Sequence, residues 1–88
     1  MQIKVVGTRK LDFVNNGQAV KGTQIFALYK DNSPFVIGES VLLRKTKDNA
    51  FKLPFVAESV ASDIPLGIYE IEADYVTGNI CSMKMVKS

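Results

Sequence analysis

Residues 67–75 read GIYEIEADY, and this stretch decides the fold class. From Tyr69 onwards, its apolar side chains alternate with the acidic side chains that begin at Glu70. A period of two places the apolar set on one face of a strand and the acidic set on the other. The stretch therefore predicts a β-strand with an acidic outer face and with four side chains in the core, namely Tyr69, Ile71, Ala73 and Tyr75.

The rest of the chain divides into short β-like runs separated by Gly, Asn, Asp and Pro. The sequence Asn15-Asn16-Gly17 predicts a tight hairpin, because Asn and Gly tolerate positive φ. The other expected strands are 2–6, continued by 10–14 after a bulge or bend at Gly7, then 20–30, 35–45 with a bend at Gly38, and 80–86 after a turn at 77–79. Residues 57–61, between Pro54 and Pro65, have room for one or two helical turns. This order predicts an all-β, five-stranded OB-type barrel in a single domain, 1–88, and an SH3-like barrel would give a similar pattern.

The composition excludes several kinds of site. The 88 residues contain no His and one Cys, which rules out a His-based triad, a His-ligated metal and an internal disulfide. Neither Gly-rich phosphate-binding pattern occurs. We therefore expect a protein that is not an enzyme and that holds no metal and no cofactor. Cys81 lies among Ile and Met, so we expect it to be a small core side chain.

Positive charge is concentrated in the first part of the chain. Residues 1–52 hold nine basic and four acidic side chains, and residues 53–88 hold two and five, within a net charge of +2. Such a segregated charge could attract an anion to one side of the domain. No apolar run approaches the roughly 20 residues of a membrane span, and the N-terminus lacks the apolar region of a signal peptide. We expect a soluble cytoplasmic protein with no membrane partner.

Basic residues alternate with aromatic residues in the same part of the chain, as single-stranded nucleic acid binding requires. Lys and Arg neutralise phosphates, and flat apolar side chains stack on bases. Within the strand 20–30, Lys21, Phe26, Leu28 and Lys30 offer such a surface. The segment 44–52 is expected to be a projecting arm that carries Arg44, Lys45, Lys47, Phe51 and Lys52.

Alternatives remain open for these residues. A basic hairpin can be a solvated edge, and Phe51 can fold back onto the core. Phe26 and Leu28 can be covered by a second subunit or by the helical turns at 57–61 instead of by a ligand. Alternation places Tyr75 in the core.

Four segments carry a family resemblance: MQIKV (1–5), KGTQIFAL (21–28), PLGIYEI (65–71) and ICSMKMV (80–86). In order and spacing they resemble the small single-stranded DNA-binding, helix-destabilising proteins of filamentous bacteriophages. The resemblance implies an OB-type barrel, a two-fold homodimer, and DNA contacts from an aromatic and a Leu two residues apart, here Phe26 and Leu28. It also implies a phosphate contact at Lys21 and a further aromatic contact, for which Tyr75 is the nearest candidate. The last turn is shorter and the strand at 67–75 more acidic than the family pattern.

The leading hypothesis is a homodimeric protein of a phage or mobile element that coats single-stranded DNA in a bacterial host, with RNA as an open alternative. A β-barrel module that binds a protein partner is the competing hypothesis. The predicted nucleic-acid-binding residues are Arg9, Lys10, Lys21, Phe26, Leu28, Lys30, Arg44, Lys45, Lys47, Phe51, Lys52 and Tyr75.

Overall fold

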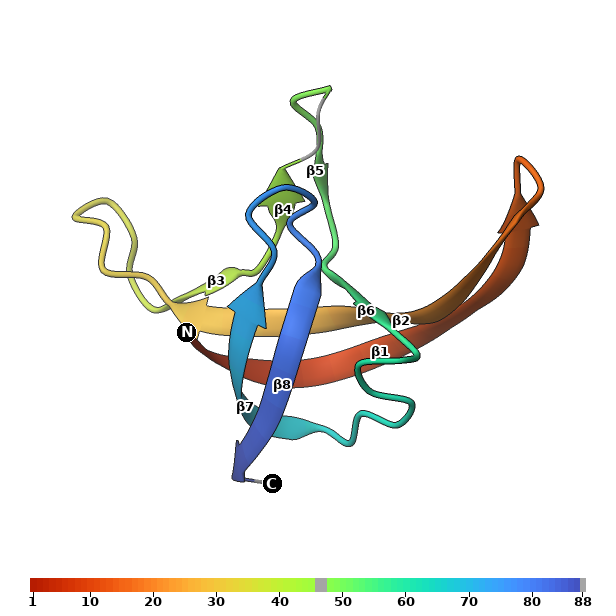
Figure 1. Cartoon of the computed structure of the whole chain (residues 1–88). Coiled ribbons are helices and arrows are strands. Elements are labelled where there is room, and N and C mark those ends of the chain that lie inside the picture. Colours follow the sequence, from red (N-terminus) through yellow and green to blue (C-terminus); the bar gives the residue numbers. More distant parts are fainter. Residues whose placement is uncertain (46–47, 88) are drawn as a thin grey trace.

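The computed structural model describes residues 1–45 and 48–87, and within them the chain forms eight strands and no helix. The first two strands are long and form one hairpin that runs across the molecule and projects from one side (Figure 1). The strands are β1 (Gln2–Asn15), β2 (Gln18–Lys30), β3 (Glu39–Val41), β4 (Arg44–Lys45), β5 (Phe51–Lys52), β6 (Phe55–Ala57), β7 (Gly67–Ala73) and β8 (Ile80–Lys87). The predicted all-β class is confirmed.

Hydrogen bonding joins five of these strands in a ring. β1 pairs with β2 and β7, β7 pairs with β8, and β6 closes the ring by pairing with both β8 and β2. The β6–β8 contact is parallel and rests on one residue pair, Val56 opposite Ile80, whereas the other pairings in the ring are antiparallel. β3 extends the sheet from β2, and β4 with β5 forms a separate two-stranded ribbon. The sheet therefore has a barrel-like closure.

A β-bulge in β1 reverses the alternation of side chains along that strand. Lys4 and Val5 lie opposite Leu28 and Ala27, but Gly7 lies opposite Phe26, so Val6 is the extra residue. A bulge re-aims the side chains that follow it. Odd-numbered residues of β1 therefore face the core before the bulge and face outward after it. The bulge or bend predicted at Gly7 is confirmed.

The core lies inside the ring and is apolar. Its buried side chains are Ile3, Val5, Ile25, Ala27, Val56, Ile64, Tyr69, Ile71 and Ile80. The Tyr69 hydroxyl donates a 2.6 Å hydrogen bond to the Pro65 carbonyl oxygen. Burial, together with the charge of Asp63, raises the pKa of Tyr69. The alternation in residues 67–75 thus correctly predicted Tyr69 and Ile71 as core side chains.

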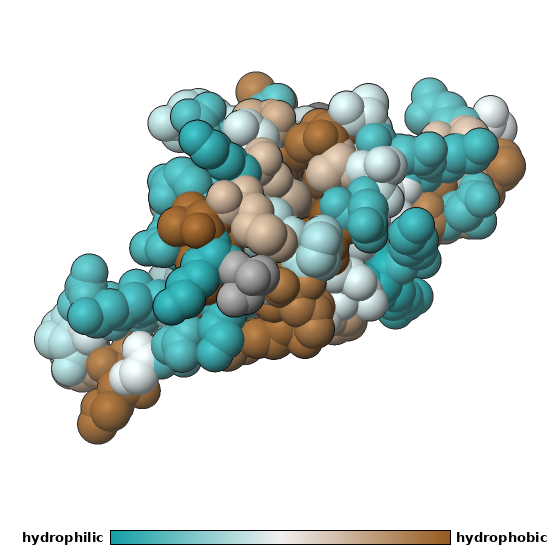
Figure 2. Space-filling model, turned by 90° about the horizontal axis from the view of Figure 1, so that it is seen from below, coloured by the Kyte–Doolittle hydropathy of each residue, from teal (hydrophilic) through white to brown (hydrophobic). Residues whose placement is uncertain are grey.

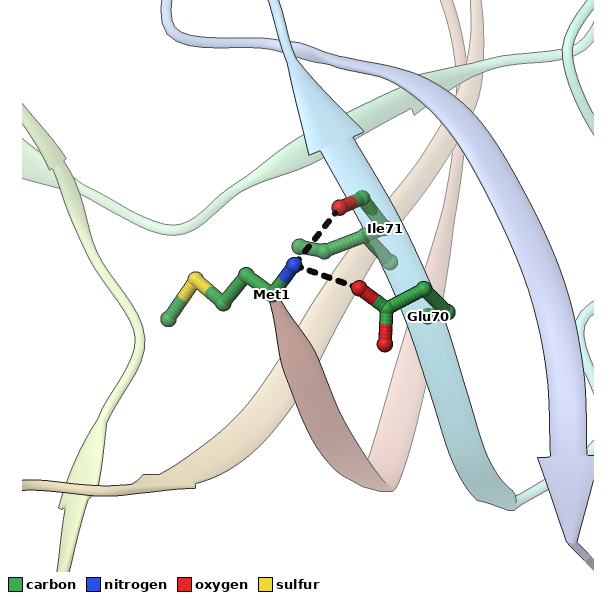
Figure 3. Close-up of polar contacts among 3 residues, drawn as sticks. All are labelled: Met1, Glu70 and Ile71. Carbon is green, nitrogen blue, oxygen red and sulfur yellow. Dashed lines mark hydrogen bonds and ion pairs between the residues drawn. The ribbon is translucent and has the colours of Figure 1, made fainter.

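The N-terminal amino group is attached to β7 (Figure 3). The Met1 ammonium forms an ion pair with Glu70 Oε1 at 2.7 Å and donates to the Ile71 carbonyl oxygen at 3.3 Å. The Ile71 amide in turn donates to the Met1 carbonyl oxygen at 2.9 Å. These bonds extend the β1–β7 pairing to the first residue and neutralise a carboxylate on the acidic outer face of β7.

Two expected elements are shorter than predicted. The strand predicted at 35–45 is reduced to β3 and β4, because residues 31–38 form an exposed loop instead. Asp31 closes that loop: its carboxylate accepts from the Ser33 amide at 2.8 Å and from the Ser40 hydroxyl at 2.9 Å, and these bonds lower its pKa. Residues 57–61 form a single hydrogen-bonded turn and no helix.

Ala73, a predicted core side chain, is exposed at the end of β7. Two other predicted core side chains, Tyr75 and Cys81, are also exposed. β7 ends at Ala73 because the Asp74 carboxylate accepts from the amides of Val76 and Thr77, which starts a turn and leaves Tyr75 fully exposed. Cys81 is the extra residue of a bulge between β7 and β8, and it is also exposed. Its thiol donates to the Glu72 carbonyl oxygen at 3.4 Å. In both places a local irregularity interrupts the alternation.

Candidate nucleic-acid interface

The outer face of β2 presents the side chains that the sequence singled out. Ile25 and Ala27 are buried, whereas Phe26 is 38% exposed, Leu28 is half-buried and Lys30 is exposed. The turn at 57–61 does not cover Phe26 and Leu28, because Glu58 and Ala61 line a hollow on the other face of the β1–β2 hairpin. An aromatic, an aliphatic and a cationic side chain thus share one accessible face.

Lys4, which the sequence analysis did not select, lies at the centre of this face. Directly opposed residues of antiparallel strands lie on the same side of a sheet. Lys4 is opposite both Leu28 of β2 and Ile68 of β7. The register therefore defines a row across five strands: Val41, Leu28, Lys4, Ile68 and Lys87. The alternation of Lys4 with buried Ile3 and Val5 was the signal in the sequence that could have identified it.

A hollow of about 310 Å³ lies beside Lys4 on this face. Leu28 and Lys30 line it on one side, and Glu39, which is opposite Lys30 in the β2–β3 register, lines it too. Lys4, Lys30 and Glu39 together give this hollow a net positive charge. The arrangement favours an anion that also has an apolar surface to place against Leu28.

Phe26 rests on Gly7. A Cβ atom at position 7 would lie 3.2 Å from Phe26 Cδ2 and 3.5 Å from Phe26 Cβ. Glycine therefore lets the Phe26 ring lie close to the β1 backbone, while its outer part stays exposed. The bulge brings these two residues opposite one another.

The long hairpin divides its basic residues between two sides. Arg9 follows Gly7 in the outward alternation and is opposite Gln24, so it lies on the side of Phe26. Lys10 is opposite buried Thr23, and Lys21 is opposite Asp12, so both lie on the other side. There Lys10 lines a hollow of about 240 Å³ together with Asp12 and Glu58. The predicted Lys21 contact therefore does not share the face of Phe26 and Leu28.

The arm formed by β4 and β5 is also two-sided. Lys45 is opposite Phe51 and Arg44 is opposite Lys52, so each pair occupies one side of the ribbon. Phe51 is 68% exposed, which contradicts the alternative in which it folds back onto the core. The predicted contact Lys47 lies outside the described residues.

Arg44 is engaged by the turn between β7 and β8. Its Nη1 donates to the Thr77 carbonyl oxygen at 3.5 Å, and its Cβ lies 3.1 Å from the place a Cβ would take at Gly78. Its Nε is buried with no hydrogen-bond partner among the residues that the structure describes. Arg44 thus packs the arm against this turn, which Figure 1 shows beside β4 and β5.

The turn itself holds Tyr75 in solvent. The Gly78 amide donates to the Asp74 carbonyl oxygen at 2.8 Å, and the Asp74 amide donates to the Asn79 carbonyl oxygen at 2.8 Å. Together with the two bonds to the Asp74 carboxylate, these fix the backbone on both sides of Tyr75. The predicted residues therefore form one group on the outer face of β2 and a second on the arm and the adjacent turn, while Lys10 and Lys21 lie apart from both, on the other side of the long hairpin.

Over the part of the chain that is described, no group of His, Cys, Asp and Glu side chains could hold a metal ion. Residues 1–45 and 48–87 contain no helix long and apolar enough to span a membrane. The chain matches no protein-family model, no curated protein and no solved structure.

Proposed function

We propose that the protein is an OB-type barrel that binds single-stranded DNA with little sequence preference and coats it during the replication of a phage or mobile element in a bacterial cytoplasm. OB-folds bind oligonucleotides on a sheet face and on two loops at its edges. In the proposed OB-type barrel we assign that face to β2 and β3, and the two loops to the β1–β2 hairpin and the β7–β8 turn. The ring of five strands with one parallel pair supports this interpretation.

The observation that carries the proposal is the outer face of β2. Phe26 offers a partly exposed ring that is held against Gly7, and Leu28 lies two residues away on the same face. Lys4, Arg9 and Lys30 surround them with positive charge. Stacking of a base on an aromatic side chain is worth about 1–3 kcal/mol, and lysine and arginine supply the affinity for phosphates.

The arm and the β7–β8 turn form a second contact. Phe51 and Tyr75 are both exposed aromatics. Lys45 is an exposed cation on the side of Phe51, and Lys52 is an exposed cation on the other side of the arm. We assign Arg44 to holding the turn that carries Tyr75, because its guanidinium already donates to Thr77.

The proposal includes a homodimer. In the loop between β2 and β3, Phe35 is 94% exposed and Ile37 fully exposed. Two large apolar side chains in water favour association, and a second copy would bury surface that an 88-residue chain leaves exposed.

The test is a titration of labelled oligo-dT followed by fluorescence anisotropy at several salt concentrations. We expect tight binding at low salt, and a slope of log K against log salt of about −0.7 for each phosphate contacted. Phe26→Ala and Phe26→Leu should weaken binding about 5- to 150-fold, the equivalent of about 1–3 kcal/mol of stacking. Phe26→Tyr keeps the ring and is the matched control.

Absence of oligo-dT binding at low salt would refute the proposal. Equal binding by Phe26→Ala and the wild type, with both proteins folded by circular dichroism, would refute the assignment of Phe26.

The competing function is a module that binds a protein partner. The apolar side chains of the row across the sheet, Val41, Leu28 and Ile68, favour it, since a protein could also cover them. It requires a partner whose affinity does not change with salt, together with no binding of oligo-dT.

A further inference from the structure

A second hollow lies next to the face of Phe26 and Leu28, on the outer side of β1, β7 and β8. Its volume is about 450 Å³. Val6, Leu66 and Ile68 form an apolar floor, and Lys4 and Lys87 lie at its ends. Val6 is 46% exposed and Leu66 56% exposed. Figure 2 views the molecule from below and shows brown apolar groups among teal hydrophilic side chains on this side of the sheet.

The strand register fixes the order of these side chains. Lys4 is opposite Ile68, and Ile68 is opposite Lys87. The three therefore point to one side of the sheet, with the two lysines two strand spacings apart, or about 10 Å between backbones. An apolar surface with a cation at each end is complementary to a base flanked by its phosphates.

The nearest carboxylate in the next row does not cancel this charge. Glu70 follows Ile68 by two residues on the outer face of β7, and its carboxylate is paired with the Met1 ammonium at 2.7 Å (Figure 3). Of the residues that line the hollow, none is acidic. The hollow therefore combines two positive charges with an apolar surface and has no lining carboxylate.

The bulge of β1 connects the hollow to the site already proposed. Val6, the extra residue, is turned outward and lines the hollow. The next residue, Gly7, lies beneath the ring of Phe26. A single-stranded DNA that stacks on Phe26 would thus reach the hollow by passing over Gly7 and Val6, two adjacent residues of β1.

We propose that this hollow is a second nucleotide subsite on the same single-stranded DNA path, in which a base lies on Val6, Leu66 and Ile68 and the adjoining phosphates contact Lys4 and Lys87. The inference rests on the proposed function and extends it across the sheet from β2 to β8. It assigns a role to Lys87, which the proposed function does not use, and a second phosphate contact to Lys4.

The test uses the full chain and oligo-dT of increasing length. Lys4→Gln and Lys87→Gln should each lower affinity two- to tenfold for long oligonucleotides, and should each reduce the magnitude of the salt slope by about 0.7. For the shortest oligonucleotides that bind, Lys87→Gln should lower the affinity less, because these oligonucleotides occupy the site at Phe26 and do not extend into the hollow. Leu66→Ser should lower affinity with an unchanged salt slope, since it removes apolar contact and no charge.

Lys84→Gln is the matched control. It removes the same charge from the same strand, but Lys84 is opposite Glu70 and does not line the hollow. If Lys84→Gln and Lys87→Gln lower the affinity for oligo-dT equally, the loss reflects only the net charge of the protein, and the proposed subsite is wrong.

The failures of the two proposals are distinguishable. If the wild type binds oligo-dT and Phe26→Ala weakens it, while Lys4→Gln and Lys87→Gln have no effect, the subsite is wrong and the proposed function stands. If the wild type binds an oligo-glutamate peptide but not oligo-dT, and Lys87→Gln abolishes that binding, the hollow belongs to an acidic peptide and both proposals fail.

Discussion

At the scale of single residues, Gly7 controls how far the Phe26 ring stands from the sheet. A methyl group at position 7 would lie 3.2 Å from Phe26 Cδ2, which is closer than ordinary contact, so the ring must move by a few tenths of an ångström. We expect Gly7→Ala to lower the affinity for oligo-dT two- to fivefold with little loss of stability. In the Phe26→Ala background the same substitution should change nothing, because there is no ring to displace.

A double-mutant cycle by fluorescence anisotropy measures this coupling. Equal losses of affinity from Gly7→Ala in both backgrounds would show that Gly7 acts on the backbone and not through Phe26.

At the scale of elements, the pairing of β6 closes the ring and depends on Gly22. A Cβ atom at position 22 would lie 2.4 Å from both the Val56 carbonyl oxygen and Phe55 Cζ, and the first of these is backbone that cannot turn aside. We expect Gly22→Ala to lower the free energy of unfolding by about 1–3 kcal/mol, measured by urea denaturation, through overpacking. Gly7→Ala, which meets only a side chain, is the control, and an unchanged midpoint for Gly22→Ala would contradict this account.

The elements also show what the sequence could predict. The turn residues on either side identified 20–30 as a strand, which covers most of β2, and alternation identified the core positions Tyr69 and Ile71. The Asn-Gly signal located the long hairpin. The core prediction was wrong at Ala73, Tyr75 and Cys81. At Tyr75 and Cys81 a side-chain-capped turn and a bulge change the alternation without changing composition. The face of Lys10 depends on the bulge at Val6, whose effect on register requires knowledge of the partner strand. The face of Lys21 follows from alternation within β2, which puts Lys21 on the side of Ile25 and opposite to Phe26.

At the scale of the whole molecule, the loop 31–38 projects from the sheet (Figure 1). Its Phe35 and Ile37 side chains are exposed to solvent. We expect the wild type to sediment as a dimer, and the double variant Phe35→Ser with Ile37→Ser to sediment as a folded monomer, because association is driven by apolar burial. Tyr75→Ser, which removes an equally exposed side chain elsewhere, should remain dimeric. A wild type that stays monomeric at high concentration, or a double variant that stays dimeric, would remove this loop from the interface.

The exposed position of Cys81 has a practical consequence. It is the one thiol in the chain, and it lies on β8 after the turn that carries Tyr75. A maleimide dye can therefore be attached at a single defined point without engineering a cysteine. Energy transfer from that dye to a label at either end of an oligonucleotide would give the polarity with which a strand crosses the sheet.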